Sequence, residues 1–139
     1  MVHFFTADVP YVVRDKGNIR DWLQQTAGKE KASIESLNII LCSDGFLYRM
    51  NVEYLGHHTL TDIITFDYSI SRKRLNGEMY ISIDRVRENA KELNNSVKDE
   101  LHRVFVHGLL HLCGYSDKSP SKKAEMRNRE DRALASRGF

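Results

Sequence analysis

Residues 96–114, with the sequence SVKDELHRVFVHGLLHLCG, decide the fold of this chain. Apolar residues recur there every three or four positions, which is the spacing of one face of an α-helix. The apolar face consists of Leu101, Val104, Phe105, Gly108, Leu109 and Leu112. Ser96 with Asp99 and Glu100 is a typical helix start, and Gly114 is a typical stop. The stretch therefore predicts a central, largely buried helix over 98–113.

The sequence upstream of this helix predicts a small sheet. Runs rich in β-branched and aliphatic residues predict strands at 2–9, 36–42, 63–68 and 79–83, with Asn76-Gly77 as a turn before the last strand. Helical spacing predicts further helices at 14–27, at 45–55 with Asp44 as the cap, from 84 onward and at 119–137. We expect an α/β (α+β) fold with a mixed, mostly parallel sheet of about four strands packed by about five helices.

Length and composition fit one domain over residues 1–139. Apolar residues make up 41% of the chain and charged residues 29%, which is typical of a globular domain. No apolar run approaches the roughly 20 residues that a membrane span needs. The first ten residues lack the basic and small-residue features of a secretion signal. The expected location is therefore the cytoplasm, with no membrane partner.

Basic clusters and a histidine pair are candidates for contacting phosphate, although a net charge of +2 does not by itself establish a nucleic-acid partner. The clusters consist of Arg72, Lys73 and Arg74, and of Lys118, Lys122 and Lys123. Each cluster is equally compatible with an ordinary solvated surface. His57 and His58 lie in a turn, where they are either solvated or at a cleft rim, contacting phosphate or moving a proton.

His107, His111 and Asp117 are the candidate metal ligands. Residues four apart on a helix project from one face, one turn apart, so the two histidines present their rings to one ion. Gly114 ends the helix, and the returning chain brings Asp117 within reach. Three nitrogen and oxygen ligands with an open position describe a catalytic zinc site, in which the ion lowers the pKa of water toward about 7. We expect Zn²⁺ here, although other divalent transition metals bind similar ligands.

Gly108 argues against a peptidase. Zinc peptidases with the pattern H-E-x-x-H carry a glutamate directly after the first histidine. This glutamate accepts a proton when water attacks an amide. Glycine cannot take that role, so the helix predicts a metal-dependent hydrolase of another kind.

The segment 107–117 resembles the H-G-x-L-H-L-x-G-Y-D-H pattern of the YbeY family of metal-dependent endoribonucleases. The matching residues are His107, Gly108, Leu110, His111, Leu112, Gly114 and Tyr115. Residues 61–66 (TDIITF) are similar to the P-T-D-V-L-S-F segment of the family, and residues 77–82 (GEMYIS) to its G-D-I-x-I-S strand. Met126 and Glu130 resemble the M…E pattern of its last helix.

Two positions depart from the family pattern. Asp117 stands where the family has its third histidine, and the resemblance implies that aspartate takes over as ligand. Leu55 stands where the family has an arginine that follows a tyrosine. Leucine cannot contact a phosphate, so that contribution is either missing or supplied by another residue, such as His57, His58 or Arg49.

The resemblance implies a zinc-dependent endoribonuclease that cuts single-stranded RNA in ribosomal RNA maturation and ribosome quality control. It also implies that His107 and His111 act through the metal, and that the partners are RNA and the ribosome or its proteins. Leu55 keeps an alternative open, a ribosome-assembly factor that binds RNA around a mainly structural metal and cuts weakly or not at all. A metallohydrolase with a small-molecule or peptide substrate is the third hypothesis. The sequence does not choose between water and the RNA 2′-hydroxyl as nucleophile.

Overall fold

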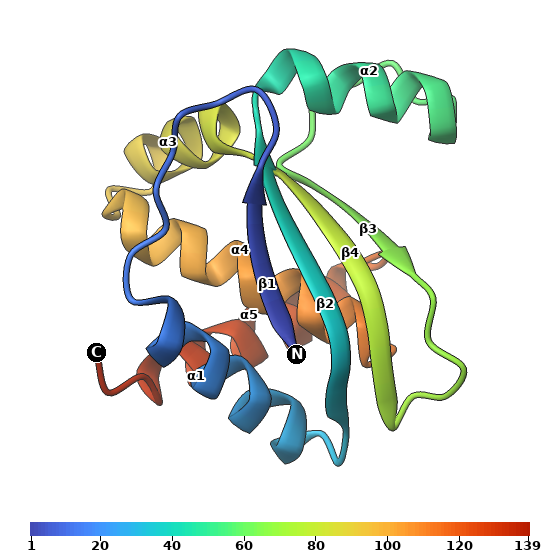
Figure 1. Ribbon diagram of the computed structural model, residues 1–139, viewed down its shortest axis with the longest axis vertical. Helices are drawn as coiled ribbons and strands as arrows, with labels where there is room; N and C mark the ends of the chain where they lie inside the picture. The colour runs from blue at the N-terminus through green and yellow to red at the C-terminus, as the bar shows by residue number, and fades with distance from the viewer.

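The sheet has four strands in the order β1-β2-β4-β3 (Figure 1). They are β1 (Val2–Thr6), β2 (Ser33–Cys42), β3 (Ile63–Asp67) and β4 (Arg74–Ser82) in a computed structural model that describes all residues, 1–139. The pairs β1–β2 and β2–β4 are parallel, and β3 runs antiparallel to β4 along the edge. The mixed, mostly parallel sheet that the sequence predicts is confirmed.

Five helices cover the sheet: α1 (Lys16–Lys29), α2 (Asp44–Leu55), α3 (Ile83–Glu92), α4 (Val97–Leu112) and α5 (Pro120–Ala135). Helices α4 and α5 pass behind the sheet in Figure 1, with α4 crossing its middle, and α1 packs against α4. The main core lies between this layer and the sheet, and Phe105 and Leu109 of α4 are completely buried in it. On the other face, Leu47 of α2 packs with Cys42 and Ile64 in a smaller core. No helix combines the length and the apolar character that a membrane span requires.

Side-chain caps fix the ends of the two helices that matter for the site. The Ser96 hydroxyl accepts a hydrogen bond from the Asp99 amide at 3.0 Å, so α4 begins where the sequence predicts. Gly114 has a φ of 103°, a left-handed conformation that favours glycine and turns the chain away from α4. Ser119 caps α5 by accepting from the Lys122 amide at 3.2 Å, and Pro120 occupies its first turn.

Several predicted boundaries are wrong by a few residues. Strand β1 ends at Thr6 rather than at residue 9, and β2 begins three residues earlier than predicted, at Ser33. Ser43, not Asp44, caps α2, because its hydroxyl accepts from the Phe46 amide at 3.1 Å. Helix α1 continues through Gly28 to Lys29.

The predicted turn at Asn76-Gly77 is also wrong, because both residues lie inside β4. Gly77 is needed there for close packing rather than for a turn. A Cβ atom at this position would lie 2.7 Å from the carbonyl oxygen of Phe66 and 3.0 Å from the side chain of Leu112. The glycine therefore lets β3 and the end of α4 approach β4, which brings the two elements of the candidate site together.

Gly77→Ala should destabilise the fold by about 3 kcal/mol, because the backbone atom it would strike cannot move without disturbing β3. Thermal unfolding should show a melting temperature roughly 10 °C lower. Gly28→Ala is the matched control, since nothing lies within 4 Å of its added Cβ atom. This control should be neutral or slightly stabilising. Equal melting temperatures for the two variants would contradict the close-packing role of Gly77.

Candidate metal site

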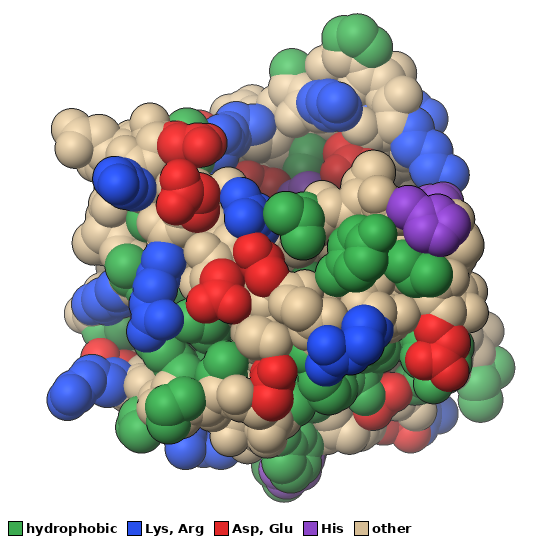
Figure 2. All heavy atoms as spheres, turned by 90° about the horizontal axis from the view of Figure 1, so that it is seen from above, with side chains coloured by type: hydrophobic (Ala, Val, Ile, Leu, Met, Phe, Trp, Pro, Cys, Tyr) green, Lys and Arg blue, Asp and Glu red, His purple; other side chains and the backbone are tan.

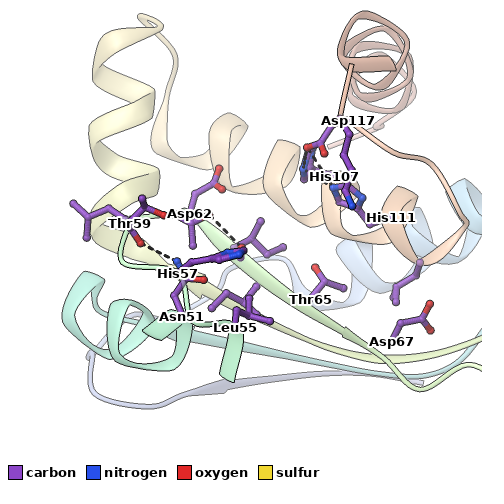
Figure 3. Close-up of a pocket in the computed structure, with 16 residues that line it drawn as sticks. Asn51, Leu55, His57, Thr59, Asp62, Thr65, Asp67, His107, His111 and Asp117 are labelled. Atoms are coloured by element: carbon purple, nitrogen blue, oxygen red, sulfur yellow. Dashed lines mark hydrogen bonds and ion pairs between the residues drawn. The ribbon is translucent and has the colours of Figure 1, made fainter. Parts of the chain in front are cut away.

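His107 and His111 lie one turn apart on α4, and Asp117 faces them from the segment between α4 and α5 (Figure 3). The Nε2 atoms of the two histidines are 3.0 Å apart. Asp117 Oδ2 lies 3.4 Å from His107 Nε2 and 3.5 Å from His111 Nε2. The structure thus brings together the three ligands that the sequence predicts, and they form the cluster in the chain that could hold a metal ion.

The size of this triangle fits a tetrahedral ion. Zinc binds histidine nitrogen and carboxylate oxygen at about 2.0–2.1 Å, which separates neighbouring tetrahedral ligands by about 3.3 Å. The three separations of 3.0, 3.4 and 3.5 Å bracket that value. The ligand atoms therefore fit one ion without rearrangement of the backbone.

The hydrogen bonds of the histidines also favour a cation. His111 Nδ1 lies 2.9 Å from the carbonyl oxygen of Tyr115, which can only accept, so Nδ1 carries the hydrogen. His107 Nδ1 lies 2.7 Å from Glu130 Oε2, which accepts in the same way. When both rings are neutral, their Nε2 lone pairs face each other and the Asp117 carboxylate. A positive ion at the centre of the triangle removes this repulsion.

Glu130 on α5 orients His107 and tunes its charge. Its side chain is 6% exposed, and Arg103 Nη1 balances its charge at 3.1 Å. Burial by itself lowers the pKa of His107, but the hydrogen bond and the charge of Glu130 outweigh burial and raise that pKa above its usual value. The pair resembles the carboxylate–histidine–metal arrangements that fix a ligand ring in metalloenzymes.

Tyr115 positions His111 from the other side. Its carbonyl oxygen accepts from His111, while its hydroxyl donates to Glu30 next to the end of α1. The guanidinium of Arg129 lies 4.2 Å from the centre of the Tyr115 ring and also contacts Glu30 at 3.2 Å. Both histidines therefore have a fixed partner on the ring nitrogen that faces away from the cluster.

The cluster lies in a cleft of about 670 Å³ between α4 and the connection from α2 to β3. Leu55, His57 and Lys118 line this cleft. A second cavity of about 280 Å³, beside His107 and Asp117, is lined by Lys123 and other residues of α5. In the space-filling view a histidine is visible inside a hollow with acidic and basic side chains around it (Figure 2).

The other predicted site residues are spread more widely. His58, Lys73 and Lys122 are exposed and do not line either cavity. Arg72 donates to the carbonyl oxygen of Leu112 at 2.5 Å and pairs with Asp67 at 2.7 Å. It therefore links the C-terminus of α4 to the end of β3. Arg74 pairs with Glu35 at 3.0 Å. Only Lys118 and Lys123 among the predicted basic residues line the two cavities.

Sequence reasoning missed the roles of Glu130, Tyr115 and Asp62. A buried glutamate on the otherwise basic, exposed α5 was the available signal for Glu130, since an isolated buried carboxylate needs a partner. No local pattern pointed to the Tyr115 carbonyl. Asp62 lines both cavities beside His107, but its neighbours come from α4 and α5, which lie far along the chain.

The family model described as Endoribonuclease YbeY matches residues 10–138. A protein of that name from Cytophaga hutchinsonii is 50% identical over 138 residues, which cover 99% of this chain and 96% of the relative. Another from Flavobacterium johnsoniae is 40% identical over 131 residues, 94% of each chain. The solution structure of TM1509 from Thermotoga maritima has a TM-score of 0.67 and 27% identity, covering 96% of this chain and 87% of that one. The resemblance in the sequence is confirmed, and this chain belongs to the YbeY family.

Proposed function

We propose that this protein is a zinc-dependent endoribonuclease that cuts single-stranded RNA, with ribosomal RNA as its substrate in the cytoplasm. The observation that carries the proposal is the triangle of His107, His111 and Asp117, whose metal-facing atoms match the ligand spacing of a tetrahedral ion. Membership in a family whose members are named endoribonucleases supports RNA as the substrate. The open side of the triangle faces a cleft large enough for a nucleotide unit.

Each residue of the site has a separate task. His107, His111 and Asp117 hold the ion, which supplies Lewis acidity toward a phosphoryl oxygen when it is bound. Glu130 and Tyr115 keep the two imidazoles in the orientation that leaves Nε2 free to bind. Lys118 lines the cleft and Lys123 lines the second cavity beside the cluster. Both lysines bind phosphates of the RNA strand that crosses the cluster.

Cleavage of labelled RNA tests this function. The zinc-loaded protein should cut a single-stranded oligonucleotide and leave the same sequence in a duplex intact. RNA binding should be measured in parallel, because Leu55 stands in the cleft where the family has an arginine and cannot itself contact a phosphate. Leu55 is 46% exposed there. Single-stranded RNA that is bound but never cut would instead support the ribosome-assembly alternative.

Reversing two charges beside the cluster should weaken RNA binding. In Lys118→Glu with Lys123→Glu, two fewer cations meet the phosphates, so the slope of log affinity against log salt should fall by about 1.4. Zinc content should not change, because neither lysine belongs to the triangle. The matched control, Lys16→Glu with Lys29→Glu on α1, changes net charge equally but away from the cleft. Equal loss of affinity in both variants would contradict a local binding site.

A further inference from the structure

Gly108 on α4 packs closely against two side chains of the sheet. A Cβ atom there would lie 2.8 Å from Ile63 Cδ1 and 2.8 Å from both Sδ and Cε of Met79. All three atoms belong to the sheet side of the interface, so α4 packs directly on β3 and β4. A carboxylate directly after the first histidine, as zinc peptidases carry it, would therefore require the side chains of Ile63 and Met79 to shift.

The same close packing brings Asp62 to the cluster. Asp62 immediately precedes Ile63, the β3 residue that touches Gly108, and lines both cavities together with His107 and Asp117. In Figure 3 its side chain rises from the start of β3 toward α4. The carbonyl oxygen of Asp62 accepts a hydrogen bond from the Ser82 amide of β4 at 2.9 Å, so the backbone that carries the side chain is fixed to the sheet.

Asp62 is the carboxylate near the cluster that has no other task. Glu130 is bound to His107, and Asp67 is paired with Arg72 at 2.7 Å. Glu100 is 4% exposed and lies beside Arg103. The Asp62 carboxylate has no hydrogen bond or ion pair with another side chain, and its hydrogen bonds are with the backbone of Asp62 and Ile63. His57, which lines the cleft with the two cluster histidines, is exposed on the loop after α2 and has no side-chain partner that fixes its ring.

The surroundings of Asp62 are mixed in charge. Burial raises its pKa above the usual value, and the charge of His107 opposes this effect. The charged groups that share the second cavity with it come from α4 and α5: Glu100, Arg103, His107, Lys123, Arg127 and Glu130. A cation bound at the cluster would lower the pKa of Asp62 and favour its ionised form, the form that accepts a proton.

We propose that Asp62 is the general base of this site, supplying from the residue before β3 the carboxylate that α4 lacks. The inference rests on the proposed endoribonuclease function. Asp62 accepts the proton of the attacking hydroxyl group, either water or the ribose 2′-hydroxyl, as the oxygen forms its bond to phosphorus. The bond from phosphorus to the departing ribose oxygen breaks, and that oxygen keeps the electron pair and takes a proton from solvent. Asp62 then returns its proton to solvent.

Asp62→Asn tests this role with little change of shape. General-base catalysis contributes about 10²–10⁴-fold, so kcat for single-stranded RNA should fall by that factor. The dissociation constant for RNA and the zinc stoichiometry should match the wild type, because the residue neither holds the ion nor binds phosphate. The wild-type rate should rise with pH to a plateau, whereas the residual rate of the variant should keep rising with hydroxide concentration.

Asp67→Asn is the matched control, since it removes the same charge from the last residue of β3, at the end of the strand away from Asp62. It should keep kcat within about threefold, far below the contribution of a general base. If Asp62→Asn also cuts within threefold of the wild type, or loses its zinc, the assignment of Asp62 is wrong. Absence of cutting by the wild type would instead overturn the proposed function, so the two failures are distinguishable.

A titration of the wild type tests the placement of Asp62 without relying on activity. NMR of the carboxyl carbons in the metal-free protein should show Asp62 with a raised pKa. Addition of Zn²⁺ should move this titration to lower pH, because the ion favours the charged form of a nearby carboxylate. If the pKa of Asp62 is the same with and without Zn²⁺, the carboxylate lies too far from the ion to act beside it, and the proposal is wrong.

Discussion

His111→Ala should leave a folded protein that has lost most of its zinc. The substitution removes one corner of the triangle, and the remaining two ligands do not enclose an ion. Because a metal supplies several kcal/mol of transition-state stabilisation, RNA cleavage should fall about a thousandfold. The His111 side chain is 30% exposed, so its loss should disturb the core little. Elemental analysis of protein purified without a metal-affinity tag measures the effect directly.

His3→Ala is the control for this variant, because His3 is exposed on β1 and contributes nothing to the cluster. It should keep full zinc content and full activity. Asp117→Ala should behave like His111→Ala, since the aspartate supplies the only oxygen ligand of the three. Stoichiometric zinc in Asp117→Ala would remove this residue from the ligand set.

Glu130→Gln should lower the affinity for zinc by about 10–100-fold, the usual effect of losing a partner that orients a metal-bound histidine. Glutamine can still contact His107 Nδ1 but brings no negative charge, and it can present its amide hydrogens instead of an acceptor. The variant also leaves Arg103 without the carboxylate at 3.1 Å that balances it. Competition with a fluorescent zinc chelator measures the change in affinity.

Glu125→Gln provides the comparison on the same helix. Glu125 is exposed and pairs only with Arg129, at 3.3 Å, so zinc affinity should stay at the wild-type value. If Glu130→Gln binds zinc as tightly as Glu125→Gln, then Glu130 stabilises the fold without tuning the metal site.

Much of the fold could be predicted because the local sequence is enough to identify its most regular helices and strands. The apolar stripe of α4 and its serine cap mark a buried helix, and β2 and β3 contain runs of β-branched and aliphatic residues. The errors lie where tertiary contacts override local preference. The pair Asn76-Gly77 is typical of a turn but lies inside β4. The glycine is needed there because Phe66 and Leu112 leave no space for a side chain.

The candidate site divides in the same way. His107 and His111 could be found from helical spacing, and Asp117 from its position after a glycine stop. Glu130 and Asp62 could not, because only the packing of α4 on α5 and β3 brings them beside His107. The contact between His111 and the Tyr115 carbonyl is local, but it depends on how the backbone turns at Gly114, which residue types alone do not specify. Arg72 and Arg74 show the reverse case, because these two charged residues suggest phosphate binding but are engaged in ion pairs within the domain.

The most direct test of the account is the rate at which one preparation cuts single-stranded RNA in three states: as zinc-loaded protein, after removal of the metal by a chelator, and after return of one equivalent of Zn²⁺. We expect cutting in the first state, at least a hundredfold loss in the second, in line with the several kcal/mol that a catalytic metal supplies, and recovery in the third. Metal-free protein that cuts as fast as the zinc-loaded form, or RNA left intact in all three states, would contradict the account.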